Sequence, residues 1–219
     1  MCGRYTLSKN RQDIADELDL IVEQDIPARF NIAPTQLVPV VTNTSNRHIE
    51  FFKWGLVPSW ADDPTIGSRM INARAETVAE KPSFRKALLK RRCLVLADGF
   101  YEWKKNADDT KTPMYIRLKD HRVFAFAGLW ETWTKQGKPL HTFTIITTTP
   151  NSLMKSIHDR MPVILRQEDH EKWLTTQETP VDKLTSLLKS YAADDMEAYA
   201  VSRLVNSPQH DSPDCIKAA

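Results

Sequence analysis

Near the middle of the chain the sequence reads Leu94-Val95-Leu96-Ala97-Asp98-Gly99-Phe100-Tyr101-Glu102-Trp103-Lys104. Residues 94–97 and 100–104 are apolar or aromatic runs of strand length. The Asp98-Gly99 pair between them is a hairpin signal, because Asp and Gly suit the backbone of tight two-residue turns. We therefore predict two strands joined as an antiparallel hairpin.

Short strand patterns and turn signals recur along the rest of the chain. Turn residues at Asp120-His121 and Gln136-Gly137 separate the apolar runs 114–118, 123–130 and 141–148. Further strands are predicted at 2–7, 37–42, 50–53, 163–165 and 197–201. Helices are predicted at 11–20, after Thr77 with Pro82 in the first turn, and at 150–157, 168–174 and 180–191, with Asn10 and Thr179 as caps. Because the helices lie between groups of strands and do not alternate with them, the pattern indicates an α+β fold with largely antiparallel sheets.

The composition is that of a soluble globular protein. The 219 residues are 41% hydrophobic and 26% charged, and no apolar run is long enough to span a membrane. No signal peptide precedes Cys2. The net charge is only +2, so composition alone does not require a nucleic-acid partner. The polar segment 207–219 is predicted to be a loose tail.

The three cysteines are Cys2, Cys93 and Cys215. An odd, sparse set without CxxC spacing indicates a reducing cytosol, and therefore a cytoplasmic protein, and argues against a zinc site. Cys93 lies in an apolar run and is expected in the core. Cys215 lies in the polar tail and has no expected role.

Cys2 directly follows the initiator methionine. If Met1 is removed, Cys2 carries both a free α-amine, with a reference pKa of about 7.7–8.0, and a thiol, with one of about 8.5. An aldehyde could condense with the amine, and the thiol could then close a five-membered thiazolidine ring. Gly3 leaves room for a substrate, and Arg4 offers a charge that suits phosphate and lowers a thiol pKa. An ordinary N-terminus is the alternative interpretation.

Three further residues stand out by type. Asn72 precedes a helix, Glu102 lies among aromatic side chains, and His158 precedes Asp159-Arg160. A carboxylate among aromatic rings tends to have a raised pKa, which suits proton transfer near neutral pH. Each also has a structural interpretation: a cap, a solvent-facing strand residue and a structural histidine. Spacing alone does not bring these residues together with Cys2.

Six motifs follow one another along the chain. They are Cys2-Gly3-Arg4-Tyr5, Asn31-Ile32-Ala33-Pro34, Trp54-Gly55-Leu56-Val57-Pro58-Ser59-Trp60, Ile71-Asn72-Ala73-Arg74-Ala75-Glu76-Thr77, Ala97-Asp98-Gly99-Phe100-Tyr101-Glu102-Trp103 and Ile157-His158-Asp159-Arg160-Met161-Pro162. In these motifs and their order the chain resembles the SOS-response-associated peptidase (SRAP) family of abasic-site processing proteins. The resemblance covers roughly Cys2 to Asn206 and implies a single domain, 1–206, with a barrel-like β core and peripheral helices.

The resemblance implies a covalent crosslink to an abasic site in single-stranded DNA. The Cys2 amine would attack C1′ of the open sugar and the thiol would close a thiazolidine. Glu102 would move protons, His158 would assist ring opening, and Asn72 would orient the amine. No metal or organic cofactor is implied, because the aldehyde is the electrophile, and the protein is expected to act as a monomer.

The same resemblance implies the DNA contacts. Arg4, Arg74 and Arg160 would bind phosphates, since a guanidinium fork matches phosphate oxygens. Pro34 and Trp60 would separate strands or stack on bases, and Thr147 would contact the backbone.

Two other function classes stay open. A thiol peptidase would use Cys2 as nucleophile, His158 or Glu102 as base and Asn72 as oxyanion donor. A non-catalytic binder of single-stranded DNA would use only the arginines and Trp60. Cys2 discriminates among them: the crosslinker needs its amine and thiol, the peptidase needs its thiol, and the binder needs neither.

Overall fold

Five strands close into a barrel in the computed structural model, which describes residues 2–219. Neighbours pair in the order β10-β4-β3-β6-β9, and β9 pairs back onto β10. The β10–β4 pair is parallel and the others are antiparallel. The barrel strands are β3 (Leu37–Thr42), β4 (Glu50–Trp54), β6 (Arg92–Ala97), β9 (Phe124–Trp133) and β10 (Leu140–Thr148).

Three short strands extend this barrel sheet. β5 (Asn72–Arg74) runs parallel to β10, β11 (Met161–Pro162) runs antiparallel to β10, and β12 (Ile164–Leu165) runs antiparallel to β9. The end of β10 therefore lies beside both β5 and β11, which brings three distant parts of the sequence together.

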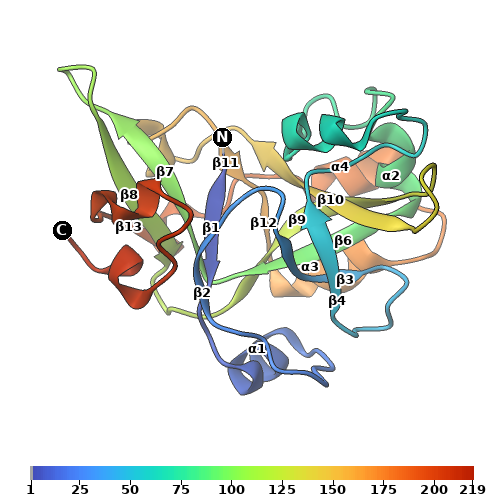
Figure 1. The fold of residues 1–219 in the computed structure, drawn as a ribbon, viewed down its shortest axis with the longest axis horizontal. Helices are drawn as coiled ribbons and strands as arrows, with labels where there is room; N and C mark the ends of the chain where they lie inside the picture. Colours follow the sequence, from blue (N-terminus) through green and yellow to red (C-terminus); the bar gives the residue numbers. More distant parts are fainter. Residues whose placement is uncertain (1) are drawn as a thin grey trace.

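A second sheet packs beside the barrel and is antiparallel throughout (Figure 1). Its order is β13-β8-β7-β1-β2. The strands are β1 (Arg4–Leu7), β2 (Arg29–Ile32), β7 (Gly99–Lys105), β8 (Lys111–Leu118) and β13 (Met196–Ala200). The prediction of an α+β fold with a largely antiparallel, barrel-like core is confirmed.

The predicted hairpin at Asp98-Gly99 is wrong. β6 pairs with β3 and β9 in the barrel, whereas β7 pairs with β1 and β8 in the second sheet. The chain thus crosses between sheets at Asp98. Gly99 is required there by close approach and not by a turn, because a Cβ at this position would lie 2.1 Å from the Tyr115 hydroxyl.

The other two turn signals have different outcomes. Gln136-Gly137 joins β9 and β10 as a hairpin, as predicted. Asp120-His121 follows β8, but β8 and β9 belong to different sheets, so this turn also carries the chain from one sheet to the other.

The helices are short and surround the sheets (Figure 1). Asn10 caps the first helix as predicted, since its side chain accepts from the Asp13 N–H at 3.0 Å. The predicted cap at Thr179 is absent: the last helix begins after Pro180 and ends at Ser186, earlier than expected. The α-helices are α1 (Arg11–Leu18), α2 (Arg85–Lys90), α3 (Gln167–Leu174) and α4 (Val181–Ser186). The 3₁₀ helices are η1 (Pro64–Arg69), η2 (Met154–Ser156), η3 (Ala193–Asp195), η4 (Arg203–Asn206) and η5 (Pro213–Ile216).

The C-terminal segment 207–219 is packed and not loose, which corrects the sequence-based expectation. The Asp211 carboxylate accepts from the backbone N–H groups of Phe30 and Asn31, at 2.5 and 3.0 Å. The Cys215 side chain is fully buried, and the last residue donates to the Ala200 carbonyl. A polar composition concealed these contacts, because they are made to backbone groups of β2 and β13. The single domain 1–206 stays a prediction.

Within residues 2–219 no helix has the length and apolar character needed to cross a membrane.

We predict that Asp98→Ala destabilises the fold by about 2–4 kcal/mol, because it removes a buried carboxylate that satisfies several donors. Those donors are the Thr6 hydroxyl, the Ser8 N–H and hydroxyl, and the Lys9 N–H. Urea unfolding measures the effect. Asp108→Ala, in the exposed turn between β7 and β8, is the control and should cost much less.

Candidate functional site

Cys2 lies at the junction of the two sheets, just before β1. β1 pairs with β7 in the register Arg4–Tyr101, and continuing that register places Gly3 opposite Glu102 and Cys2 opposite Trp103. The Cys2 side chain is fully buried. The strand pairing therefore sets the distance between Cys2 and the carboxylate on β7.

Asn72 reaches Cys2 from the barrel side. It begins β5, which pairs in parallel with β10 and aligns Asn72 with Ile145. The Asn72 Nδ2 donates to the Cys2 carbonyl at 2.8 Å. Its Oδ1 is buried and has no hydrogen-bond partner within residues 2–219. The side chain thus holds the Cys2 backbone with one end and keeps an acceptor available at the other.

Glu102 and His158 complete the cluster. The His158 Nε2 lies 3.8 Å from the Glu102 Oε2. Glu102 is 2% exposed, and this burial raises its pKa to about 7. Burial also lowers the pKa of His158, whose Nδ1 accepts from the Arg160 N–H at 3.1 Å. Glu102 is therefore tuned toward proton exchange near neutral pH, whereas His158 is shifted toward its uncharged form.

The structure thus brings together Cys2, Asn72, Glu102 and His158, which lie far apart in the sequence. Cys2 and Glu102 belong to the second sheet or its edge, Asn72 belongs to the barrel sheet, and His158 lies in the loop before β11. Burial, and secondarily the charge of Glu102, raises the pKa of the Cys2 thiol far above its usual value. This corrects the expectation that Arg4 lowers it, and it means that the thiol needs a base before it can react.

Arg4 points away from this cluster. Its Nη1 donates to Asn31 Oδ1 at 2.8 Å and to the Val205 carbonyl at 2.7 Å. Its Nη2 donates to the Asn206 carbonyl at 3.2 Å, and the guanidinium carbon lies 6.0 Å from the Trp103 ring centroid. These contacts tie Arg4 to Asn31, Val205 and Asn206 and occupy three of its five N–H donors, so Arg4 has a structural role.

Arg74, Thr147 and Arg160 gather at the end of β10. Thr147 aligns with Arg74 across the parallel β5–β10 pair, and the Thr147 carbonyl accepts from Arg160 Nη2 at 2.7 Å. Arg74 is exposed, whereas the Arg160 side chain is only 12% exposed. Two of the three predicted phosphate-binding arginines therefore lie next to each other, beside the loop that carries His158.

Sequence reasoning gave no role to Glu76, which the structure places against Arg160. Its carboxylate makes a bidentate ion pair with Arg160, at 2.7 Å from Nη1 and 2.9 Å from Nη2. The two residues are 84 positions apart, so no local pattern indicates the pair. The one signal in the sequence is that Glu76 belongs to the Ile71–Thr77 motif, which also contains Asn72 and Arg74.

The two proposed stacking residues lie in loops. Trp60 is 55% exposed, and its carbonyl accepts from the Lys135 Nζ at 2.9 Å. Pro34 follows β2 and is half-buried, and the next residue, Thr35, donates to the Trp54 carbonyl. An exposed indole of this kind offers a face for stacking.

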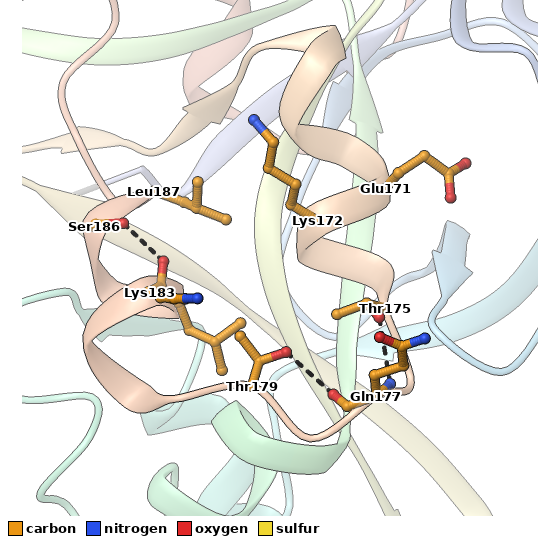
Figure 2. Close-up of a pocket in the computed structure, with 9 residues that line it drawn as sticks. Glu171, Lys172, Thr175, Gln177, Thr179, Lys183, Ser186 and Leu187 are labelled. Atoms are coloured by element: carbon orange, nitrogen blue, oxygen red, sulfur yellow. Dashed lines mark hydrogen bonds between the residues drawn. The ribbon is translucent and has the colours of Figure 1, made fainter.

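A large open cavity lies elsewhere, between α3 and α4 (Figure 2). It has a volume of about 700 Å³ and is lined by Lys172, Lys183 and Leu187 among others. None of the predicted site residues lines it. A smaller cavity of about 440 Å³ borders Glu76 and the end of β10 and is therefore adjacent to the candidate site.

Among residues 2–219 there is no group of three or more His, Cys, Asp and Glu side chains that could hold a metal ion.

Comparison with known proteins gives consistent matches. A family model described as SOS response associated peptidase (SRAP) matches residues 1–208. Abasic site processing protein YoqW of Bacillus subtilis (strain 168) is 51% identical over 223 residues, covering 100% of both chains. Abasic site processing protein YedK of Escherichia coli (strain K12) is 30% identical, covering 99% of each. A crystal structure of a protein from Bacteroides thetaiotaomicron superposes with a TM-score of 0.90 at 32% identity over the full length of both chains.

Glu102→Gln is expected to stabilise the protein above neutral pH. Between its usual pKa of about 4.3 and the folded value of about 7, Glu102 is ionised in the unfolded chain and protonated in the folded one. Wild-type stability therefore falls as pH rises through this window, whereas the variant lacks the effect. Urea unfolding should show no gain at pH 4 and a gain of about 1–3 kcal/mol at pH 8.

The exposed Glu178→Gln is the matched control and should change stability equally little at both pH values. A gain for Glu102→Gln that is the same at pH 4 and pH 8 would contradict the raised pKa.

Proposed function

The chain belongs to the SOS response associated peptidase (SRAP) family, and on that premise we propose that it processes abasic sites in single-stranded DNA by forming a covalent crosslink through Cys2. Full-length relatives are named abasic site processing proteins. The observation that carries the proposal is the cluster itself: Asn72 holds the Cys2 backbone, the charge of the buried Glu102 acts on the Cys2 thiol, and His158 lies 3.8 Å from Glu102.

The chemistry begins with removal of Met1, which frees the Cys2 amine. The amine attacks the C1′ aldehyde of the ring-opened abasic sugar, and the resulting hydroxyl leaves as water to give a Schiff base. The Cys2 sulfur then adds to C1′, its proton passes to a base, and the ring nitrogen regains a proton. The product is a thiazolidine with no net change of oxidation state.

Glu102 is the proton shuttle in this proposal. Since its pKa is about 7, it is present in both forms near neutral pH. The protonated form donates to the leaving hydroxyl, and the ionised form accepts the proton of the thiol, whose raised pKa makes such a base necessary. Burial disfavours the charged forms of both Glu102 and the Cys2 thiol. It therefore raises the pKa of the carboxyl toward neutral pH and also makes the thiol depend on a base.

His158 and Asn72 have supporting roles. His158 lies within 3.8 Å of Glu102, and we assign to it the protonation of the sugar ring oxygen during ring opening. Asn72 already holds the Cys2 carbonyl at 2.8 Å, which fixes the direction of the amine.

The DNA strand runs past Arg74, Arg160 and Thr147 in this proposal, with Trp60 and Pro34 against bases. The clustering of Arg74 and Arg160 at the end of β10 supports the phosphate contacts. The phosphate role predicted for Arg4 has less support, because its guanidinium is engaged by the segment 205–206. The protein acts on DNA as a monomer, since one chain supplies the whole cluster.

The two rival functions are weaker on specific grounds. A thiol peptidase requires an accessible thiolate, and burial raises the pKa of the Cys2 thiol. Self-cleavage after Met1 stays within the proposal only as the step that exposes the amine. A simple DNA binder would have no use for a buried carboxylate with a pKa of about 7.

Glu102→Gln should slow crosslinking by about 10²–10⁴-fold while leaving DNA affinity nearly unchanged, because Gln keeps the shape but cannot carry the proton. Crosslinking is followed on a denaturing gel with abasic single-stranded DNA. Affinity is measured with an analogue that has no aldehyde and therefore binds without crosslinking. A wild-type rate in the variant would remove Glu102 from the mechanism.

Two changes at position 2 separate the amine from the thiol. Cys2→Ser keeps the amine but offers a poorer ring-closing group, so we expect a Schiff base that borohydride traps and that is otherwise lost. One residue inserted between Met1 and Cys2 moves the free amine away and should abolish the heat-resistant adduct. Both are read on denaturing gels after intact mass has verified Met1 removal. A stable adduct from the extended variant would rule out an N-terminal thiazolidine.

A further inference from the structure

The guanidinium of Arg160 is already occupied by internal partners. Nη1 and Nη2 bind the two carboxylate oxygens of Glu76, and Nη2 also donates to the Thr147 carbonyl. A guanidinium has five N–H donors. The Nε–H is buried and has no partner within residues 2–219. Apart from the buried Nε–H, these contacts leave only one N–H of the group, on Nη1, without a partner among residues 2–219.

A phosphate needs the fork that Glu76 now fills. Carboxylate and phosphate bind a guanidinium in the same bidentate geometry, through two parallel N–H groups. With Glu76 on both Nη atoms, a DNA phosphate cannot make such a contact to Arg160. Two anions on the same fork would also repel each other. The carboxylate and the phosphate are thus alternatives at this position.

The burial of the two partners makes an exchange physically reasonable. The Arg160 side chain is 12% exposed and the Glu76 side chain is 46% exposed. A largely buried cation is costly to leave without an anion, whereas a half-exposed carboxylate can turn toward water. Hydrogen bonding from Arg160 lowers the pKa of Glu76, so the carboxylate is charged at neutral pH.

Lys189 offers a second partner for the same carboxylate. Glu76 and Lys189 line one open cavity of about 440 Å³, together with Ala75, Thr148 and Thr149. Lys189 is exposed and forms no ion pair with any residue from 2 to 219. A carboxylate that left Arg160 would therefore have a cation available across the cavity.

We propose that Glu76 is a latch on the DNA-binding face: its carboxylate occupies Arg160 in the free protein, and an incoming DNA phosphate displaces it toward Lys189. The inference rests on the proposed function, because it assigns the occupant of Arg160 in each state. Glu76 then sets DNA affinity without touching the reacting atoms. The apparent Kd is the intrinsic value divided by the fraction of protein with the latch open.

Binding to a single-stranded oligonucleotide with a tetrahydrofuran abasic analogue tests the latch. The analogue has no aldehyde, so binding stays reversible and is read by fluorescence anisotropy. Glu76→Gln should tighten binding about tenfold if the latch is closed nine times out of ten. Glu80→Gln removes the same charge four residues later from an exposed position and should change binding by about twofold or less.

A double-mutant cycle tests Lys189. Lys189→Gln should weaken binding in the wild-type background, because the displaced carboxylate loses its second partner, and should have no effect beside Glu76→Gln. Lys119→Gln, in the exposed turn after β8, is the control for loss of a positive charge. Thermal unfolding of each variant verifies the fold.

Each result decides the inference. Tighter binding by Glu76→Gln alone, with the background-dependent effect at Lys189, supports the latch. Weaker binding by Glu76→Gln makes Glu76 a positioning residue for Arg160 and overturns the latch, as does an effect equal to that of Glu80→Gln. An equal loss from Lys189→Gln in both backgrounds overturns the role of Lys189. If the wild type does not bind the oligonucleotide, the proposed function fails first, and the latch with it.

Discussion

The rest of the structure depends on the hydrogen bonds that the Asp98 carboxylate accepts from the residues at the end of β1. The carboxylate lies where the chain leaves the barrel for the second sheet, and it accepts hydrogen bonds from the Thr6 hydroxyl and from the backbone of Ser8 and Lys9. It therefore ties the end of β1 to the start of β7. Because β1 is short, this anchor fixes its register on β7, and the register decides what lies beside Cys2.

Burial at the junction of the sheets then determines the chemistry of the site. The same low-polarity surroundings raise the pKa of Glu102 to about 7, raise that of the Cys2 thiol and lower that of His158. Near neutral pH the Cys2 thiol and His158 are therefore held uncharged, whereas Glu102 is present in both of its forms. Proton transfer between neighbouring groups is then favoured over a permanently ionised nucleophile.

Sequence reasoning predicted elements better than pairings. Apolar runs bounded by turn signals located most strands, and the Asn10 cap and the turn at Gln136-Gly137 follow from local chemistry. The hairpin at Asp98-Gly99 was wrong because the same dipeptide serves a crossing between sheets, where Gly99 makes room for Tyr115. The prediction of a loose tail was wrong because the tail binds backbone groups of β2, and such contacts cannot be recognised from amino-acid composition.

The sequence by itself determined the residue types of the site and the motifs that carry the family resemblance. It could not show that Arg4 donates to the Val205 carbonyl, 201 positions away, or that Arg160 pairs with Glu76, 84 positions away. The aromatic neighbours of Glu102 did indicate its raised pKa, but nothing in the sequence indicated the raised pKa of the Cys2 thiol. Burial sets both pKa values, and burial exists only once two sheets from distant parts of the chain have packed together.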